Sequence, residues 1–555
     1  MPSLAGPSKI RVLLATGVAL LAGALGPAAA LAAPAGLVDT RLPVPASNPL
    51  SAPTAIVPIL DTGRAFVLEQ TGAVRVLQAD GTVLAADALS LDVCATGEQG
   101  LLGGAVDPGF AANGYVYLYY THDAGDCSNS TGRANRVSRF TTTGNTIDPG
   151  SEVVLLDNMN TPATNHNGGD LEIGHDGHLY VTVGDGGVNP RGGGGTSAQD
   201  LSLLNGKILR ITTAGTVPAD NPFVGAANAT SCRTTGITTP TSAVCTEIYA
   251  SGLRNPFRFA FDPNTPATRF FINDVGEGTW EEVDEGGSGR NYGWRSREGF
   301  CVTGSSTNCP APPAGITDPL TAYNHSTDCT YVTGGAFIPD GIWAAAYDGG
   351  YLFADGGCGK VFLRTAAGTV DYGDPFATTS GVPTDLSFLT QGGRTALYYV
   401  TSTSGQLHAI TLPPRPPSEG GPGPAPGTPG TPGTTPDPPG GSGTPPATRC
   451  TIVGIKGLLA STARTRVRAA GCKVRQRLVA MRNGRPLVRR GAYVTSRATR
   501  PPKRSAGRGR VWTLRVEKSV RKAGGRFAVG TYQTFWVGWE STPKKIAKQP
   551  KARYL

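Results

Sequence analysis

The segment from Asn165 to Gly187, NHNGGDLEIGHDGHLYVTVGDGG, contains three of the six histidines of the chain, four carboxylates and seven glycines. These residue types suit a metal site, a series of turns or an acid–base centre. His175 and His178 flank an Asp-Gly turn, which favours solvated histidines over metal ligands. His166 differs, because it lies among polar and glycine residues directly before an expected strand, where loops on a rigid scaffold present functional groups.

A histidine at such a position can act as a general base near neutral pH if a partner orients its ring. Asp185 follows the expected strand 179–183 and can supply that partner if the hairpin brings its two ends together. The residues alone leave a second interpretation open, in which His166 is an ordinary surface histidine.

Two further segments carry groups that could do chemistry. Arg254 and Asn255 precede a proline, which keeps the chain extended there. An arginine fixed in such a turn can bind a developing oxyanion or a carboxylate, although it can equally tie down a neighbouring loop. Residues 274–285 hold six carboxylates in a glycine-broken segment without EF-hand spacing, which suits either a hard cation such as calcium or a solvated acidic loop.

The elements that must position these groups are short strands. Apolar and aromatic runs alternate with turns rich in Gly, Asp, Asn and Thr, and long amphipathic helices are absent from the pattern. FVLEQTGAVRVL, YLFADGGCGKVFL and LYYVTSTSGQLHAI each predict a strand, a small turn and a second strand. A hairpin repeated in this way is typical of a propeller, and a β-sandwich with many hairpins is the alternative.

The chain divides into four parts. Residues 1–32 have the basic start, apolar run and small-residue end of a signal peptide, so we expect an exported protein. Residues 38–412 form the expected propeller domain, and the Pro/Gly-rich residues 413–448 form an extended linker. No other segment is long and apolar enough to predict a transmembrane span.

Residues 449–555 are predicted to form a small basic β-rich domain. This part contains 28 lysines and arginines but only two glutamates, so the +10 net charge of the chain arises here while the rest is acidic. In an exported protein, an anionic cell-envelope polymer or acidic polysaccharide is a more plausible partner than nucleic acid, and a cationic module without a specific ligand is equally possible.

The ten cysteines predict disulfides, because export places the chain in an oxidising compartment. The local pairs that the spacing suggests are Cys94 with Cys127, Cys232 with Cys245, Cys301 with Cys309, Cys329 with Cys358, and Cys450 with Cys472.

Six segments, taken in order, resemble the glucose/sorbosone dehydrogenase family, the soluble sugar dehydrogenases that use pyrroloquinoline quinone (PQQ). The matching segments are GEQGLLGGAVDPGFAANGYVYLYYT, NHNGGDLEIGHDGHLYVTVGDGG, LNGKILRI, IYASGLRNPFRFAFDP, NDVGEGTWEEVDEGGSGRNYGW and, more loosely, GGYLFADGGCGKVFLR. The resemblance covers residues from about 40 to 412. It implies an all-β, six-bladed propeller that holds the quinone in a cleft on one face.

The resemblance also implies roles for individual residues. His166 matches the catalytic base that removes the proton of a sugar's anomeric hydroxyl, and Asp185 matches the aspartate that orients it. Arg254 matches the arginine that contacts the quinone and the reacting oxygens, with Asn255 beside it. The backbone carbonyls of Gly276 and Glu277 correspond to the ligands of the calcium that polarises the quinone.

Other matches extend the site or depart from the family. A second, structural calcium would fall to Glu282 and the backbone of Tyr292. Glu98 stands where glucose-oxidising members have a glutamine against the cofactor, and Asn165 replaces an aspartate before the histidine. The cations that grip the quinone's carboxylates have no fixed match, and Lys360 and Arg364 are merely nearby.

The sequence therefore predicts a secreted PQQ- and calcium-dependent aldose dehydrogenase that oxidises C1 of a sugar to a lactone and passes electrons to an external acceptor. Two alternatives remain open: a non-catalytic propeller of the same family that binds a glycan or protein, and a lactonase-type hydrolase.

Overall fold

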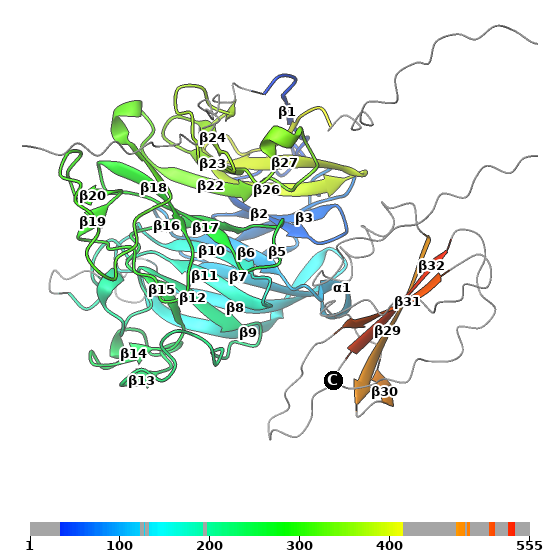
Figure 1. The fold of residues 1–555 in the computed structure, drawn as a ribbon, viewed down its shortest axis with the longest axis horizontal. Helices are drawn as coiled ribbons and strands as arrows, with labels where there is room; N and C mark the ends of the chain where they lie inside the picture. The colour runs from blue at the N-terminus through cyan, green and yellow to red at the C-terminus, as the bar shows by residue number, and fades with distance from the viewer. Residues whose placement is uncertain are drawn as a thin grey trace, which may run out of the picture.

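The computed structural model describes residues 34–122, 127, 133–192 and 197–414, together with four strands between residues 473 and 538. Between residues 38 and 411 the strands form six four-stranded antiparallel blades (Figure 1). The first strand of each blade packs against the first strand of the next, and the sixth returns to the first, so the six blades close a ring. This all-β, six-bladed propeller confirms the predicted fold class.

The strands of the first three blades, from the axis outward, are as follows. Blade 1 is β2 (Pro53–Ile59), β3 (Arg64–Glu69), β4 (Ala73–Leu77) and β5 (Leu89–Ser90); blade 2 is β6 (Leu101–Val106), β7 (Tyr115–His122), β8 (Ala134–Thr143) and β9 (Thr146–Asn160); blade 3 is β10 (Gly168–Ile173), β11 (His178–Val183), β12 (Lys207–Thr212) and β15 (Ile248–Ser251).

The other three blades follow the same order, except that the outermost strand of blade 6 comes from the start of the domain. Blade 4 is β16 (Pro256–Phe261), β17 (Phe270–Asp274), β18 (Trp280–Glu285) and β21 (Thr321–Asn324); blade 5 is β22 (Val332–Phe337), β23 (Tyr351–Asp355), β24 (Lys360–Arg364) and β25 (Ala377–Thr378); blade 6 is β26 (Pro383–Gln391), β27 (Arg394–Thr401), β28 (Gln406–Thr411) and β1 (Val38–Arg41).

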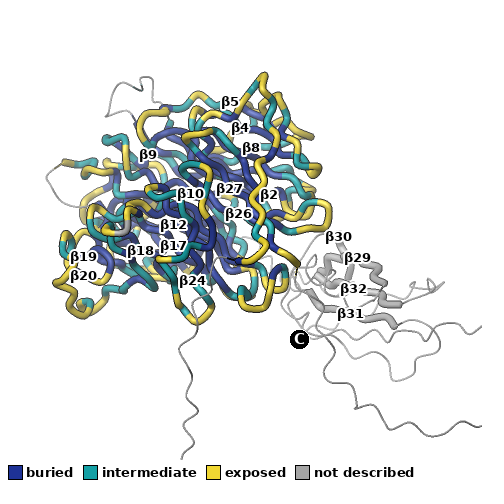
Figure 2. Tube along the Cα trace, turned by 90° about the horizontal axis from the view of Figure 1, so that it is seen from above, coloured by how far each residue is buried: buried dark blue, intermediate teal, exposed yellow. Residues whose placement is uncertain are grey.

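The three hairpins predicted from sequence are the second and third strands of blades 1, 5 and 6. Each carries a run of buried residues, because both faces of a blade are covered by its neighbours. Six apolar clusters result, one between each pair of neighbouring blades. Figure 2 shows these buried strands inside a shell of exposed loops.

The innermost strand of every blade contains a register shift near its beginning. The shifts lie between Pro53 and Ala55, Leu101 and Gly103, Gly168 and Leu171, Pro256 and Arg258, Val332 and Gly335, and Pro383 and Asp385. A bulge bends its strand and redirects side chains, and bulges are common beside active sites. His166 and Arg254 each lie two residues before such a bulged strand, β10 and β16 respectively.

Hydrogen bonds from polar side chains to backbone groups connect the inner strands of different blades. Arg258 of β16 donates hydrogen bonds to the carbonyl oxygens of Thr54 in blade 1 and Leu102 in blade 2, at 2.7 and 2.9 Å. Asp170 of β10 accepts from the Phe259 amide at 2.9 Å, and Asp385 of β26 accepts from the Ile56 amide at 2.7 Å. These bonds satisfy backbone groups that an edge strand would otherwise leave unpaired.

Smaller elements lie outside the blades. They are the short helix α1 (Phe110–Asn113), the pairs β13 (Ala229–Thr230) with β14 (Val244–Cys245) and β19 (Arg297–Glu298) with β20 (Cys301–Val302), and 3-10 turns at Ser197–Gln199, Gly236–Thr238, His325–Thr327 and Ala345–Tyr347.

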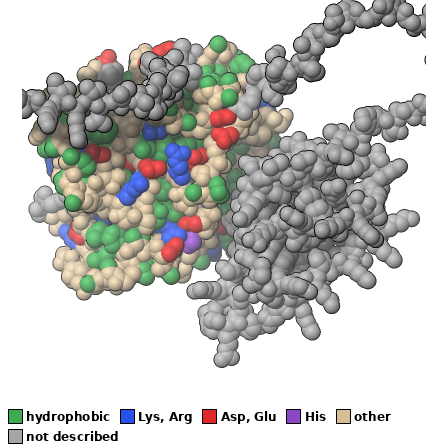
Figure 3. Space-filling model, viewed as in Figure 1, with side chains coloured by type: hydrophobic (Ala, Val, Ile, Leu, Met, Phe, Trp, Pro, Cys, Tyr) green, Lys and Arg blue, Asp and Glu red, His purple; other side chains and the backbone are tan. Residues whose placement is uncertain are grey.

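On the face seen in Figure 3, acidic and basic side chains are interspersed rather than gathered in blocks of one sign.

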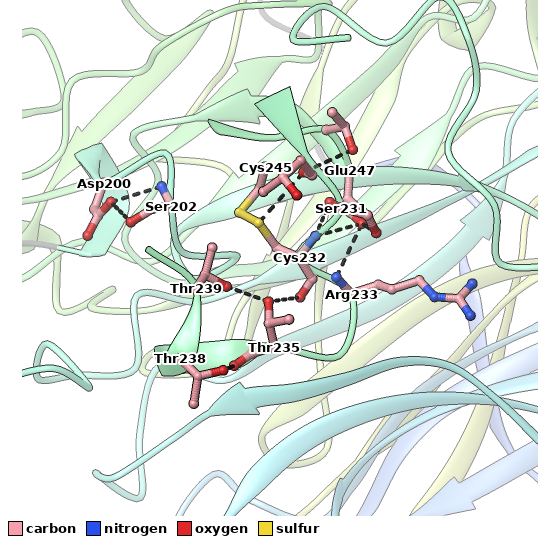
Figure 4. The surroundings of a disulfide bond; sticks show 12 residues. Asp200, Ser202, Ser231, Cys232, Arg233, Thr235, Thr238, Thr239, Cys245 and Glu247 are labelled. Atoms are coloured by element: carbon pink, nitrogen blue, oxygen red, sulfur yellow. Dashed lines mark hydrogen bonds between the residues drawn. A yellow bond between two sulfur atoms is a disulfide. The ribbon is translucent and has the colours of Figure 1, made fainter. Parts of the chain in front are cut away.

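Four of the predicted disulfides are present. They join Cys94 to Cys127, Cys232 to Cys245, Cys301 to Cys309, and Cys329 to Cys358. Around Cys232 the carboxylate of Glu247 accepts the amides of Cys232 and Arg233 (Figure 4), so the insertion between β12 and β15 is fixed by a covalent bond and by hydrogen bonds. The predicted pair Cys450–Cys472 lies outside the described residues.

Beyond the propeller, β29 (Lys473–Arg482), β30 (Arg485–Val488), β31 (Arg510–Val516) and β32 (Thr531–Gly538) form one antiparallel sheet in the order β30-β29-β32-β31. The predicted signal peptide 1–32 and nearly all of the predicted linker 413–448 lie outside the described residues. Among those that are described, no helix has the length and apolar character to cross a membrane.

Candidate active site

His166 and Asp185 lie at the two ends of the β10–β11 hairpin, and the structure brings them together. The Nδ1 atom of His166 lies 2.7 Å from Oδ1 of Asp185. His166 has a φ of 57°, a left-handed conformation that is uncommon outside glycine and clusters at functional sites. With Nδ1 engaged by the carboxylate, Nε2 is the nitrogen that can accept a proton.

The carboxylate of Asp185 has three donors. Oδ1 accepts from His166 and from the Gly187 amide at 2.9 Å, while Oδ2 accepts from Nε1 of Trp294 at 2.7 Å. Burial pushes the pKa of Asp185 upward, but the bonds from His166, Gly187 and Trp294 outweigh it and hold the pKa below its usual value. The carboxylate is therefore ionised at neutral pH and can stabilise a protonated imidazole.

Glu98, which precedes blade 2, hydrogen-bonds both to His166 and to Asn255, which precedes blade 4. Its Oε2 atom accepts the backbone amide of His166 at 2.8 Å and the side-chain amide of Asn255 at 3.1 Å. Asn255 in turn accepts the Gly168 amide at 3.0 Å. Glu98 and Asn255 thus fix the backbone on both sides of the histidine.

The backbone amide of Arg254 is hydrogen-bonded, whereas one nitrogen of its guanidinium has no hydrogen-bond partner. Asp274 accepts the amides of Arg254 and Asn255 at 2.9 and 2.6 Å, and NH1 of Arg254 donates to the Val275 carbonyl at 3.0 Å. The guanidinium lies 5.5 Å from the ring centroid of Trp294. Its Nε is buried without a hydrogen-bond partner, a costly state that a bound oxygen would relieve.

A cavity of about 270 Å³ lies on the axis beside these residues. Its walls come from all six blades and are Ala52, Thr54, Gln70, Gly97, Glu98, Leu102, Gly168, Asn255, Phe257, Arg258, Val275, Tyr331, Thr333, Val382, Thr384 and Ser402. The Thr333 hydroxyl is buried with no hydrogen-bond partner. The blade 5 and blade 6 side is uncharged, since neither Lys360 nor Arg364 lines the cavity.

The predicted calcium loop starts next to the cavity, directly after Val275. The amides of Glu277, Gly278, Thr279 and Trp280 all donate to Oε1 of Glu298, at 2.9 to 3.1 Å. Burial alone would raise the pKa of Glu298. The hydrogen bonds from the backbone amides outweigh this effect and hold the pKa below its usual value. The loop is therefore held by its N–H groups, and within the described part of the chain no hydrogen bond reaches the Gly276 or Glu277 carbonyl oxygens.

Glu282, the residue predicted for the second calcium, lies in a carboxylate cluster with Asp274 and Asp284. One oxygen of each lies within 4.8 Å of the others. Both oxygens of Asp284 are buried without a hydrogen-bond donor. Burial raises the pKa of all three carboxyl groups, to about 7 for Asp274. Repulsion by neighbouring carboxylates raises the pKa of Glu282 and of Asp284 further. A divalent cation would neutralise such a cluster.

The structure gathers Glu98, His166, Asp185, Arg254 and Asn255 at one place. Glu98 and Asn255 line the cavity, whereas His166, Asp185, Arg254 and the exposed Asn165 do not. The side chain of Tyr292, whose backbone was the predicted calcium ligand, donates its hydroxyl to the Glu285 carbonyl at 2.8 Å. His175 is exposed and His178 pairs with Asp176, so neither belongs to the site.

The sequence singled out neither Trp294 nor Glu298 as a site residue, and Asp274 and Asp284 were candidates only among the six carboxylates of residues 274–285. Trp294 ends the matching segment SGRNYGW, and Asp274 and Asp284 belong to the acidic segment, so a signal existed for these three. Glu298 has no such signal, because its role depends on backbone amides that converge only in the fold.

The fold and the site define a class: a six-bladed propeller with a His–Asp pair and an arginine beside an axial cavity. The sequence model of the glucose/sorbosone dehydrogenase family matches residues 50–355, more than half of the 555 residues. The chain therefore belongs to the glucose/sorbosone dehydrogenase family, as the resemblance implied, and is a propeller of the sugar-dehydrogenase type.

Among its relatives, the chain is similar to the HIPL2 protein of Arabidopsis thaliana, with 30% identity over 317 residues (46% of this chain and 42% of that protein). It is similar to the aldose sugar dehydrogenase of Escherichia coli K12, with 30% identity over 208 residues (37% and 48%). The chain thus spans about half the length of these curated relatives. The PQQ-bound aldose sugar dehydrogenase of Streptomyces coelicolor shares the fold, with a TM-score of 0.50, 22% identity and coverage of 68% of this chain and 100% of that one.

Proposed function

We propose that this protein is an exported, PQQ-dependent aldose dehydrogenase that oxidises the anomeric carbon of a sugar to a lactone. The observation that carries the proposal is the His166–Asp185 pair, which lies with Arg254 near an axial cavity lined by residues from all six blades. Family membership and the names of relatives support the same activity.

The residues present fit a flat cofactor with several oxygens. The cavity is lined by Glu98, Gly168 and Asn255, which surround the backbone of the base, and its Thr333 hydroxyl has no hydrogen-bond partner. The nearby Arg254 has a buried Nε that also lacks a partner. Glu98, Asn255 and Arg254 would hold PQQ on this side. When bound, PQQ would accept the hydride from the sugar and pass its two electrons to an external acceptor.

The chain's own residues would perform the proton chemistry. Nε2 of His166 takes the proton of the anomeric hydroxyl while the C1–H bond gives up its electron pair as hydride, so that a C1=O bond forms and the sugar becomes a lactone. Asp185 holds the ring in one tautomer and stabilises its protonated state. Arg254 stabilises the negative charge that develops on the substrate oxygen.

Calcium is the metal that we propose at two places. The carbonyls of Gly276 and Glu277 would supply the first site, at the loop fixed by Glu298. Glu282 and the backbone of Tyr292 were the ligands expected for the second, to which we add Asp274 and Asp284. Carboxylate and carbonyl oxygens are the ligands that calcium prefers.

The second site has a test that does not depend on catalysis. Calcium should raise the melting temperature of the protein after it has been treated with a chelator, and Asp284→Asn should remove most of that rise. An equal rise in the variant would rule out this cluster as a calcium site.

One observation favours a second function, a non-catalytic glycan- or protein-binding propeller. The cavity wall of blades 5 and 6 is uncharged, so no cation there opposes the carboxylates of PQQ.

We also propose that the protein acts outside the cytoplasm, which the four disulfides support. The basic residues 449–555 would then attach it to an anionic polymer of the cell envelope.

The decisive experiment uses the exported protein loaded with PQQ and calcium. Binding of PQQ is followed by absorbance or calorimetry, and reduction of a dye is measured with a panel of aldoses, beside His166→Ala. We expect PQQ binding in both proteins and dye reduction only in the unaltered one. Absence of both from the unaltered protein would overturn the proposal, and lactone hydrolysis without PQQ would replace it with a hydrolase.

A further inference from the structure

We infer that Trp294 is a positioning residue for the catalytic base, acting through the carboxylate of Asp185. The inference rests on the proposed function for its catalytic consequence, but the contact itself does not. Trp294 lies 109 residues from Asp185 in the sequence, in the segment that leads from blade 4 to its outer hairpin β19–β20.

The contact divides the two carboxylate oxygens between different donors. Oδ2 takes the indole N–H at 2.7 Å, which leaves Oδ1 for Nδ1 of His166 and the Gly187 amide. A carboxylate bonded at both oxygens cannot turn about its Cβ–Cγ bond without losing a bond. The indole therefore fixes the oxygen that faces the histidine and, through it, the tautomer of the ring.

Trp294 is itself well held. Its side chain is buried, its amide donates to the Gly252 carbonyl at 2.9 Å, and its carbonyl accepts from Gln199 at 2.7 Å. Trp294 is therefore held in place by contacts that do not involve His166 or Asp185.

The same ring faces the cation of the site. The guanidinium of Arg254 lies 5.5 Å from the indole centroid, within the range of a cation–π contact. One side chain thus contacts both the group that orients the base and the group expected to stabilise the developing oxyanion. Sequence position gives no hint of this, because the three residues come from different blades or loops.

Loss of the indole donor has a defined consequence. The Oδ2 atom would be left without a donor in a buried place, so Asp185 would rotate and its negative charge would be shared less evenly. The imidazole would sample both tautomers when neutral.

The test is Trp294→Phe in the full chain, which keeps the ring and removes the N–H. Trp343→Phe is the matched control, because Trp343 is buried between blades 5 and 6, away from the site. In ¹⁵N NMR spectra of histidine-labelled protein without cofactor, assigned with His166→Gln, we expect His166 of the unaltered protein to be one tautomer, protonated at Nδ1. Trp294→Phe should show a mixture, and Trp343→Phe should not.

Kinetics of the loaded enzyme give the second measurement. We expect Trp294→Phe to lower kcat about 10- to 100-fold with little change in KM, the size of one lost hydrogen bond to a charged group. Trp343→Phe should lower stability and leave both kcat and KM in place. An unchanged tautomer together with an unchanged kcat would overturn the inference. If the unaltered protein oxidises no sugar, the proposed function fails, and the NMR result alone decides the role of Trp294.

Discussion

His166 illustrates how a single residue is prepared for chemistry by its backbone. Its φ of 57° costs free energy that a surface histidine would not bear, and the surrounding bonds maintain it: Glu98 accepts its amide, and its carbonyl accepts the Gly186 amide at 3.1 Å. The conformation places the ring against Asp185. With a side chain that is 11% exposed, His166 differs from the ordinary surface histidine that the sequence also allowed, and this geometry suits the general base that we propose.

The first prediction concerns Asp185. Asp185→Asn keeps the shape of the side chain but can present an N–H to Nδ1 of His166, which favours the tautomer with Nδ1 bare and Nε2 protonated. We expect kcat for aldose oxidation to fall about 10²- to 10⁴-fold, because the nitrogen that must accept the proton already carries one. Steady-state dye reduction measures the loss.

Asp176→Asn is the comparison variant, because Asp176 also pairs with a histidine, His178, at the opposite end of strand β11. It should lower stability, since Asp176 also binds Arg210, and leave kcat unchanged. Equal losses of kcat in both variants would show that the His166–Asp185 contact has no special role.

A second residue-level prediction concerns pH. Burial raises the pKa of Asp170 to about 7, against the opposing effect of Arg258, whereas in the unfolded chain the carboxyl has its ordinary value near 4. The folded protein therefore binds a proton that the unfolded chain has already lost, and this contribution to stability declines as pH rises from about 4 to 7. Asp170→Asn removes that pH dependence.

The measurement is urea unfolding of both proteins at pH 5 and pH 8. The free energy of unfolding of the unaltered protein, minus that of the variant, should fall by about 2 to 3 kcal/mol between the two pH values. A difference that stays constant with pH would contradict a raised pKa for Asp170.

The tightest point of the hairpin β10–β11, whose second strand was predicted over residues 179–183, is a glycine. A Cβ on Gly184 would lie 2.1 Å from the His166 carbonyl oxygen and 2.9 Å from Oδ1 of Asn255. The backbones of the two ends therefore touch here, and this approach brings His166 and Asp185 within hydrogen-bond distance. Only glycine permits it.

Gly184→Ala should consequently push the His166 backbone away from β11. We expect kcat/KM to fall at least 10-fold and the free energy of unfolding to fall by about 1 to 3 kcal/mol, as in other overpacked sites. Gly373→Ala is the control, since its Cβ would meet only a carboxylate oxygen of Asp371, at 3.3 Å. Equal kcat/KM for Gly184→Ala and the unaltered protein would show that the close approach does not position the base.

The elements also show what the sequence could and could not reveal. Hairpins such as β3–β4 and β23–β24 were predictable, because their alternation and turns are local. The bulge at the start of each inner strand was not, since it depends on how a strand meets its neighbours across the axis. The same limit applies to Trp294 and Glu298, whose partners are supplied by distant segments.

The ring is closed by the packing of β26 against β2 and by a strand pairing, in which β1 from the start of the domain pairs with β28 from its end. The four residues of β1 are all exposed, so apolar burial contributes little to holding this strand. Asp39 provides a specific anchor: it accepts the Tyr399 hydroxyl at 2.6 Å and pairs with Nδ1 of His408 at 3.0 Å. Loss of this pairing would expose the outer edge of β28 and free the strand that precedes blade 1, so this anchor should control the stability of the ring where its two ends meet.

Asp39→Ala tests this argument. It removes a carboxylate that bonds two buried side chains, so we expect the free energy of unfolding to fall by about 1 to 3 kcal/mol. Hydrogen exchange should accelerate first at the amides of β1 and β28 and then at β27, because these strands lose their edge protection in that order. Asp80→Ala, in an exposed turn of blade 1, is the control and should leave these amides unchanged. Exchange that accelerates evenly over all six blades would contradict a local opening at β1. Faster exchange confined to blade 6 would show that the ring opens where β1 pairs with β28.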